Sequence, residues 1–297
     1  MLEGSDARYG PAVGANAPLL RYFVVLIEVA AYLGLRLLLH LDLDAYMLAG
    51  IPFLVAFQLG IQRRPLRTLW VRSGPPLRVD RWFVVLWVLF SLYPGYELLI
   101  ALSHGNLLSA AYLVMDIVGA FGMAYAVRAM RLANLWQLML CVLTVAVLGI
   151  LPSVISLVLP HVLNLHLHLH AATSTAERPS LLAALQAGLG TFLLMPRGFV
   201  VEEVFFRGAL DTYLHAGERG VGWLSAIFVS ALWGLWHLTA QDLTAGHLIS
   251  TIIGLMFSQV VIGVPLSLWW RKSGNLMVND TAHAVLDAWV SALPFVA

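Results

Sequence analysis

An all-α bundle of transmembrane helices is the fold class that this sequence predicts, on the evidence of its composition and of the lengths of its apolar segments. Hydrophobic residues make up 60% of the 297 positions, whereas charged residues make up only 11%. Ordinary soluble domains carry about 25% charged residues, so these few charges could not cover a water-facing surface. Apolar runs of about 17–25 residues, long enough to cross a bilayer as helices, recur along the chain. The sequence therefore predicts a polytopic membrane protein of eight or nine helices.

Nine apolar segments are candidate spans, and the second is short enough to be re-entrant, which leaves the helix count at eight or nine. Residues 1–17 precede them and lack the ordered regions of a signal peptide, so we expect a polar N-terminal tail. No internal repeat or linker separates the spans into soluble domains. The predicted spans are 18–40, 45–61, 82–102, 107–127, 136–159, 181–213, 221–240, 247–270 and 276–296.

Positive charges indicate the orientation of the chain in the membrane. Arginines cluster in the loop 63–81, at 128–131, and with lysine at 271–272. Alternating the nine spans places these three loops on one side, which the positive-inside rule makes cytoplasmic, so the N-terminus is predicted to be cytoplasmic as well. The net charge of +1 does not suggest a nucleic-acid partner, and the single Cys141 cannot form an internal disulfide.

The loop 160–180 is predicted to lie on the opposite side and is rich in histidine. Its histidines alternate with leucine, at His161, His166, His168 and His170. Such a tract is either a metal-binding segment or a wetted edge at the membrane surface. The other ionisable residues within spans are expected to pair structurally between helices; they are Glu28, Arg36, Glu97, Asp116 and Arg197.

Segment 201–208 places two adjacent glutamates and an arginine inside an apolar run. Glu203 and Arg207 are four residues apart, so a helix would put them on one face in the favourable order for an ion pair. Glu202 has no such partner in its own segment. A charge in the bilayer core costs at least ~2.5–3.5 kcal/mol, so these residues form either a polar clamp between helices or a functional site.

Two further polar signals follow in the last part of the chain. Trp233 and His237 share one face of the next predicted helix, where a lone histidine would ordinarily be a core residue. The midpoint between Glu202 and His237 falls in a polar turn at 215–220, so a helical hairpin would bring the two side chains level. His283 and Asp287 share a face of the final span at a similar expected depth.

The three motifs together resemble the CAAX prenyl protease and bacteriocin-processing (Abi) family of intramembrane proteases. The resemblance rests on Glu202-Glu203-x-x-x-Arg207, then Trp233-x-x-x-His237, then His283-x-x-x-Asp287, in this order. It covers about 181–297, which is then expected to be a catalytic helical core, while 18–180 supplies the N-terminal helices. The family usually has Phe where Trp233 stands and often Asn where Asp287 stands. Asn279-Asp280-Thr281 is interpreted as a helix N-cap just before His283.

The resemblance implies an intramembrane endopeptidase acting on a membrane-associated, lipidated or precursor peptide. It implies catalytic roles for Glu202, Glu203, His237, His283 and Asp287, with Arg207 and Trp233 as structural support. Glu202 would be the general base on water, because water is a poor nucleophile at neutral pH and requires a base to remove its proton. His237 would polarise that water, and His283 with Asp287 would stabilise the oxyanion.

Several alternatives remain open from the sequence. Glu202, His237 and His283 are also an adequate zinc set, so the site is either metal-dependent or metal-free. The chain could instead be a non-catalytic scaffold or immunity-type protein of the same fold, or a transporter or haem protein that uses its histidines. We expect a multi-pass protein of a prokaryotic cytoplasmic membrane, with lipid and a peptide or lipidated protein as partners. The identity of the substrate is not encoded in these motifs.

Overall fold

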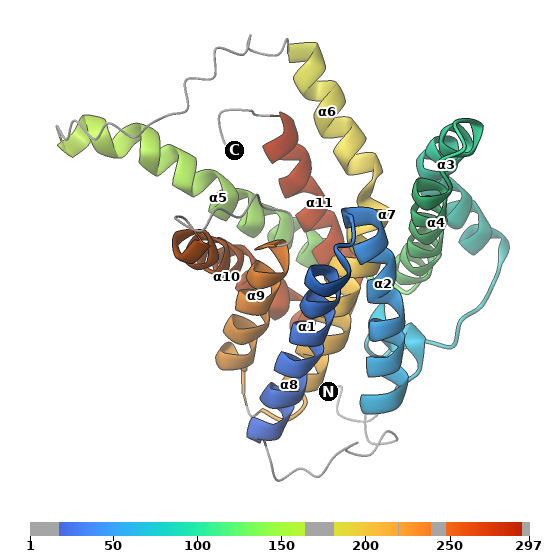
Figure 1. Cartoon of the computed structure of the whole chain (residues 1–297), viewed down its shortest axis with the longest axis horizontal. Coiled ribbons are helices and arrows are strands. Elements are labelled where there is room, and N and C mark those ends of the chain that lie inside the picture. The colour runs from blue at the N-terminus through green and yellow to red at the C-terminus, as the bar shows by residue number, and fades with distance from the viewer. Residues whose placement is uncertain (1–17, 164–180, 219, 239–247, 293–297) are drawn as a thin grey trace.

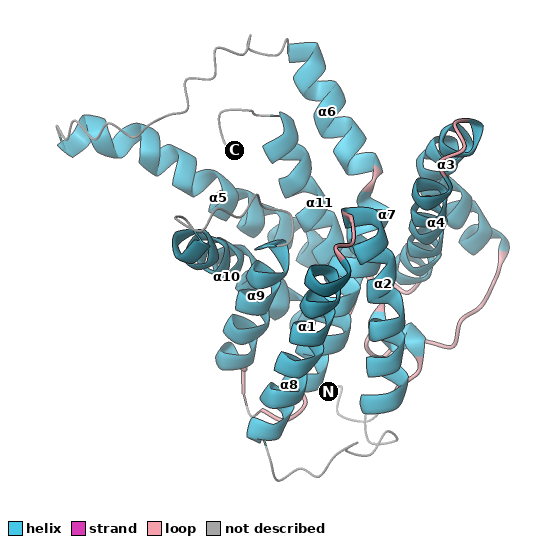
Figure 2. Cartoon of the chain, viewed as in Figure 1, coloured by secondary structure: helices cyan, strands magenta, loops and turns pink. Residues whose placement is uncertain are grey.

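The computed structural model describes residues 18–163, 181–218, 220–238 and 248–292 (Figure 1). Every regular element in these ranges is helical (Figure 2), and one isolated antiparallel bridge joins Val71 to Asn275. The predicted all-α bundle is thereby confirmed. The predicted tail 1–17 and most of the histidine-rich loop, residues 164–180, lie outside the described residues.

The N-terminal half consists of long helices, three of which begin at a side-chain cap. Asp42, Asp80 and Asn106 each accept a backbone N–H three residues ahead, at 2.8, 2.8 and 3.1 Å, and so begin α2, α3 and α4. The elements are α1 (Pro18–Leu39), α2 (Leu43–Ala56), the π-helical turn η2 (Phe57–Ile61), the short η3 (Leu66–Leu69), α3 (Arg81–Ser103), α4 (Leu107–Arg128) and α5 (Leu132–Leu163).

The C-terminal half packs against these helices and contains the three motifs. Helix α9 packs on α10, and α11 packs on both α5 and α6. The elements are α6 (Leu181–Leu193), α7 (Met195–Gly198), the π-helix η4 (Phe199–Asp211), α8 (Thr212–His215), α9 (Trp223–His237), α10 (Leu248–Ser273) and α11 (Leu276–Ala292).

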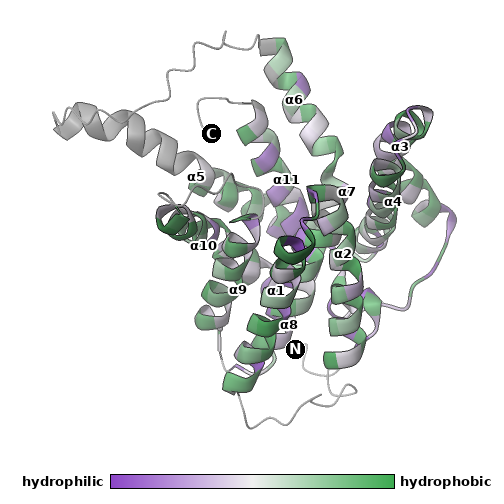
Figure 3. Cartoon of the chain, viewed as in Figure 1, coloured by the Kyte–Doolittle hydropathy of each residue, from purple (hydrophilic) through white to green (hydrophobic). Residues whose placement is uncertain are grey.

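The helices have the lengths and surfaces of membrane spans. Among the described residues, five helices are long and apolar enough to cross a bilayer, and two shorter apolar helices accompany them. The five are Leu19–Leu39, Arg81–Ser103, Leu107–Arg128, Leu132–Gly149 and Leu248–Ser273. Large apolar side chains point outward, as lipid allows and water does not; Leu92 and Leu99 of α3 are 60% and 68% exposed. Figure 3 shows mainly hydrophobic helices, with hydrophilic residues on α11.

Element η4 is the centre of the bundle (Figure 1). It contacts α2, α4, α7, α8, α9, α10 and α11, and every residue from 203 to 214 is buried. Gly208 lets the backbone of η4 approach the backbone of η3 closely, because a Cβ at this position would lie 2.6 Å from the carbonyl oxygen of Leu69. Gln62 also reaches η4, where its Nε2 donates to the Ala209 carbonyl at 2.8 Å. The N-terminal half therefore holds the segment that carries the paired glutamates.

The three arginine-containing loops meet at one end of the bundle, as the alternation of spans predicts. The backbone N–H of Arg72 donates to the Gly274 carbonyl at 2.8 Å, and the Asn275 side chain donates to the Ala126 carbonyl at 2.7 Å. Arg271 binds both carboxylate oxygens of the buried Asp211, at 3.0 and 2.6 Å. By the positive-inside rule this end is the one predicted to face the cytoplasm.

Two local predictions are wrong. The expected single span 181–213 is broken at Leu194, because Pro196 has no N–H to continue the hydrogen bonding of α6. The expected N-cap at Asn279-Asp280-Thr281 does not exist; α11 begins at Leu276 instead, where the Asn275 side chain accepts the N–H of Met277 at 3.0 Å. Residues 279 and 280 are therefore buried within the helix.

The contact between α9 and α10 predicts the effect of a single methyl group. A Cβ on Gly234 would lie 2.7 Å from the Leu255 carbonyl oxygen and from the Met256 Cα, whereas a Cβ on Gly254 meets nothing within 4 Å. We expect Gly234→Ala to cost about 1–3 kcal/mol because backbone must move, and to lower the melting temperature in detergent. Gly254→Ala is the matched control and should leave it unchanged or higher. Equal melting temperatures for the two variants would contradict this packing.

Candidate active site

Glu202, at the first turn of η4, is the point on which three aromatic side chains converge. The indole Nε1 of Trp233 donates to Glu202 Oε2 at 3.0 Å. The Nε2 atoms of His237 and His283 lie 3.7 and 4.0 Å from the same oxygen. From the sequence, Trp233 was expected only to give structural support. The structure shows that its indole N–H, which a phenylalanine lacks, fixes the carboxylate.

A backbone contact fixes the orientation of the His237 ring. Its Nδ1 lies 2.9 Å from the carbonyl oxygen of Trp233, one helical turn earlier. Because a carbonyl only accepts, Nδ1 carries the hydrogen of this contact, and Nε2 is the ring atom turned toward Glu202. The His237 side chain is 25% exposed, so this part of the site is not sealed from its surroundings.

His283 is held in the same manner by a carboxylate. Its Nδ1 lies 3.0 Å from Glu203 Oε1, which places the Nε2 atom toward Glu202 and within 3.5 Å of Asp287 Oδ2. Since an ionised carboxylate only accepts, Nδ1 of His283 also carries a hydrogen. Glu203 is buried, whereas the Asp287 side chain is 53% exposed and forms the open edge of the site.

Arg207 stands behind this arrangement and is completely buried. Its Nε lies 4.0 Å from Glu203 Oε2, at the limit of an ion pair, and its guanidinium lies 4.7 Å from the centre of the Trp233 ring. The expected i to i+4 pairing is thus present but loose, because η4 has the wider turn of a π-helix. Arg207 supplies positive charge behind Glu203 and a cation–π contact behind the indole.

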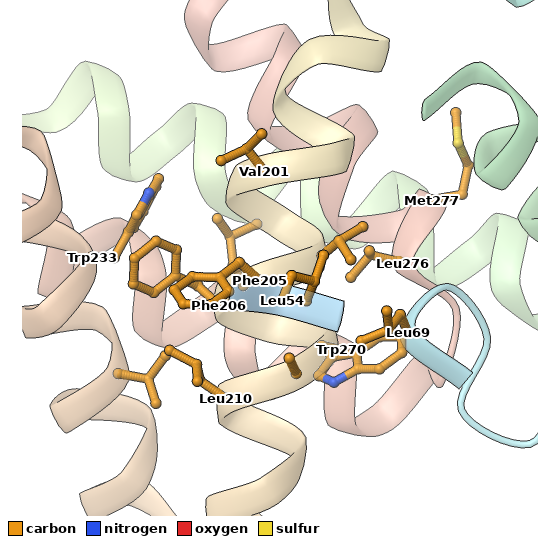
Figure 4. Packing of buried hydrophobic residues seen from close by; sticks show 14 of the residues in the cluster. Leu54, Leu69, Val201, Phe205, Phe206, Leu210, Trp233, Trp270, Leu276 and Met277 are labelled. Carbon is orange, nitrogen blue, oxygen red and sulfur yellow. The ribbon is translucent and has the colours of Figure 1, made fainter. Parts of the chain in front are cut away.

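Next to the glutamates in η4 are buried apolar side chains (Figure 4). Figure 4 shows Phe205 and Phe206 of η4 lying close to each other, with Trp233 and Leu210 nearby. The two phenylalanine rings meet edge to face at 5.2 Å, and each is about 1% exposed. This dense packing leaves the charged groups little freedom to move, so the distances between them are set by the helices.

A cavity of about 280 Å³ opens beside Glu202 and His283. Its walls come from the corner between α6 and α7, from η4 and from α11. The lining residues are Thr191, Leu194, Met195, Glu202, Asp280, His283, Ala284 and Asp287. The sequence analysis missed the four that carry no charge, because neutral side chains in an apolar helix give no signal of a cavity. Asp280 was expected only as part of a helix N-cap.

The remaining charged residues within predicted spans lie away from this cavity. Arg36 stacks over the ring of Tyr46 at 5.3 Å, and Glu97 lines a different cavity. Asp116 is fully buried in α4, and Glu28 is partly buried in α1. The side chain of Arg197 lies outside the described residues. None of the four described side chains lines the cavity at Glu202.

The zinc alternative requires three ligands around one point. Within the described residues, no group of three or more His, Cys, Asp or Glu side chains has the arrangement of a metal site. The Glu202 oxygen that both histidines approach already accepts the Trp233 N–H at 3.0 Å. Because no three-ligand set is present among the described residues, no step below is routed through a metal.

The two adjacent glutamates are predicted to differ in their effect on stability. Glu203→Gln leaves the buried Arg207 without its nearest anion, and breaking a buried pair in this way costs about 3–5 kcal/mol. Glu202→Gln retains an amide oxygen that accepts the Trp233 N–H, so its cost should be small. Thermal unfolding of both purified variants in detergent measures this difference. A larger loss for Glu202→Gln than for Glu203→Gln would show that the stabilising roles are reversed.

Comparison with known families places this geometry in context. The family model described as Type II CAAX prenyl endopeptidase Rce1-like matches residues 184–289. That range holds all three motifs and leaves α1 to α5 outside it. Comparisons with curated proteins and with solved structures find no match to this chain. The match confirms the resemblance seen in the motifs: residues 184–289 of this multi-pass membrane protein are similar to the type II CAAX prenyl endopeptidase Rce1-like family.

Proposed function

We propose that this chain is an intramembrane endopeptidase that hydrolyses a peptide bond with water activated by Glu202. The observation that carries the proposal is the approach of two imidazole Nε2 atoms and one indole N–H to a single carboxylate oxygen at the edge of a cavity. Charged groups are costly inside a membrane protein, so such a convergence favours a functional site over a polar clamp. The family similarity of residues 184–289 supports a peptidase.

The reaction begins with proton transfer from water to Glu202. A water in the cavity donates one hydrogen to the carboxylate and the other to the Nε2 lone pair of His237, which is 3.7 Å from the same carboxylate oxygen. Glu202 removes the proton as the water oxygen attacks the carbonyl carbon of the peptide. The negative charge then develops on the carbonyl oxygen, which becomes part of a tetrahedral intermediate.

His283 and Asp287 lie where this charge would be stabilised. His283 is braced by Glu203, and a protonated Nε2 would donate to the oxyanion, an interaction whose loss typically costs ~2.7–4 kcal/mol. Asp287, 3.5 Å from the same Nε2, favours the protonated ring. The intermediate collapses when the carbon–nitrogen bond breaks and Glu202 returns its proton to the leaving amine. Carboxylate and imidazoles are thereby restored.

The substrate in this proposal is a peptide that reaches the bundle from the membrane. The cavity is enclosed by α6, α7, η4 and α11, and two of its walls are apolar residues, Leu194 and Met195. A membrane-anchored, lipidated or precursor peptide would enter such a site without crossing open water. We place the protein in a cell membrane with the arginine-containing loops in the cytoplasm.

The first test of this function is the loss of Glu202. We expect Glu202→Gln to reduce cleavage by about 10²–10⁴-fold, because the general base is lost while the shape is kept. Membrane-associated peptide fragments from cells that express either form would be compared by mass spectrometry. Glu28→Gln, on α1 and outside the cavity, is the matched control and should cleave like the native chain.

The outcomes separate the proposal from its alternatives. Equal fragment patterns for the native chain and Glu202→Gln would remove the catalytic assignment and favour a scaffold. An equal effect of Glu28→Gln would favour a transport pathway instead, because the effect would then not be confined to the cavity.

The second test concerns metal. Because the described residues hold no group of three ligands arranged for a metal, we expect cleavage by the purified protein to survive treatment with a chelator and removal of the chelated metal. The rate before and after treatment is the measurement, with added zinc as the control. A loss of activity that zinc restores would show that the metal-free mechanism is wrong.

A further inference from the structure

A second cavity, of about 500 Å³, lies between α3 and α4 at the ends that they share. Tyr93, Glu97, Ile100 and His104 line it at spacings of three and four residues, so one face of α3 forms a continuous wall. This wall runs from the middle of α3 to its C-terminal cap, which is the end remote from the arginine-containing loops. The α4 side contributes Ser109 and its neighbours.

The second cavity and the catalytic cavity share one residue, Leu194. This residue forms the corner between α6 and α7 and lines both spaces. One turn earlier, Gly190 faces α3: a Cβ at this position would lie 3.9 Å from the hydroxyl of Tyr93. The two cavities are therefore neighbours along this corner, and the side chain of Leu194 borders both.

The charged residues that line the two cavities are all acidic. Glu202, Asp280 and Asp287 line the catalytic cavity, and Glu97 lines the second. Among the described lining residues neither cavity has a lysine or an arginine, although the chain contains 17 of them. Each cavity also has one histidine. His104 lines the second cavity, and His283, whose protonated ring donates to the oxyanion in the proposed mechanism, offsets only one of the three carboxylates of the catalytic cavity.

Asp280 is a lining carboxylate with one oxygen that lacks a hydrogen-bond partner among the described residues. This oxygen is Oδ2, and the residue is only 1% exposed. A buried carboxylate oxygen without a donor is costly, and a donor that enters the cavity removes this cost. A positively charged donor gains most, because charge-assisted hydrogen bonds are about twice as strong as neutral ones.

We infer that the substrate is a peptide with basic side chains, one of which binds Asp280 in the catalytic cavity while a second, farther along the peptide, binds Glu97 in the second cavity. This inference rests on the proposed function and extends it to the substrate class. The peptide passes Leu194 between the two cavities. Because α3 and α4 lie outside residues 184–289, every residue that lines the second cavity except Leu194 lies outside the match to the family.

The test uses the full chain in lipid nanodiscs and matched pools of short N-acylated peptides. The two pools differ only in carrying lysine or norleucine at one position, which is moved along the peptide. At two positions, we expect the native chain to cleave the lysine peptides with a kcat/KM about tenfold or more above that of the norleucine peptides. A tenfold ratio corresponds to the contribution of one charge-assisted hydrogen bond. Norleucine keeps the aliphatic stem, so only the charge is tested.

Two variants assign the two positions. Asp280→Asn should reduce the lysine-to-norleucine ratio to about one at the position nearer the cleaved bond, and Glu97→Gln should do so at the farther position. Glu28→Gln is the control, since this residue lines neither cavity, and it should retain both preferences. Equal cleavage of the two pools by the native chain, or ratios that neither variant changes, would overturn the inference.

A binding measurement separates this inference from the proposed function. If the native chain cleaves neither pool, hydrolysis itself has failed, and fluorescent lysine and norleucine peptides are then titrated onto Glu202→Gln. A preference for the lysine peptide of about tenfold in binding supports the basic-peptide site without hydrolysis. Adding Asp280→Asn to Glu202→Gln should then abolish this preference. Equal binding of the two peptides, as expected if a lipid chain occupies the second cavity, refutes it.

Discussion

The bond between Glu203 and His283 is the interaction on which the geometry of the site depends. It joins η4 to α11 across 80 residues of sequence, at 3.0 Å and out of contact with solvent. Because one imidazole nitrogen is engaged there, the other must point toward Glu202 and Asp287. Arg207 supplies the countercharge that lets Glu203 stay ionised behind the ring, and its guanidinium also contacts Trp233. The two adjacent glutamates therefore have different positions: Glu203 faces the interior, and Glu202 faces the cavity.

The rest of the bundle keeps this buried charge in place. At the arginine-containing end, Arg271 binds Asp211 and also donates to the carbonyls of Val221 and Gly222, at 2.7 and 2.6 Å. It thus ties the end of η4, the turn before α9 and the end of α10 to one another. Breaking such a pair on one side leaves an uncompensated charge, so these contacts are costly to lose singly. The orientation of His237 follows from α9, and α9 is fixed at this turn.

The sequence predicted the elements that depend on local pattern and missed those that depend on tertiary contacts. Helix lengths and order follow from apolar runs, and the turn near 220 brings Glu202 and His237 together as the hairpin argument expects. The break at Leu194 was not predicted, because the apolar run continues on both sides of Pro196. The bond from Glu203 to His283 could not be predicted, since it requires η4 and α11 to be neighbours. Leu194 could not be singled out from the sequence, because its position beside two cavities depends on how the helices pack.

The π-helical form of η4 explains why the N-terminal half is needed for a site whose motifs all lie in the C-terminal half. A π-helix is rare and is found mostly as single turns, so the sequence of residues 199–211 does not by itself secure thirteen residues of it. Side chains from elsewhere support it: Gln62 binds the Ala209 carbonyl, and the backbone at Leu69 packs against Gly208. Both contacts come from the segment that follows α2, outside the residues that match the family model. The position of Glu202 relative to the two histidines is therefore a property of the whole bundle.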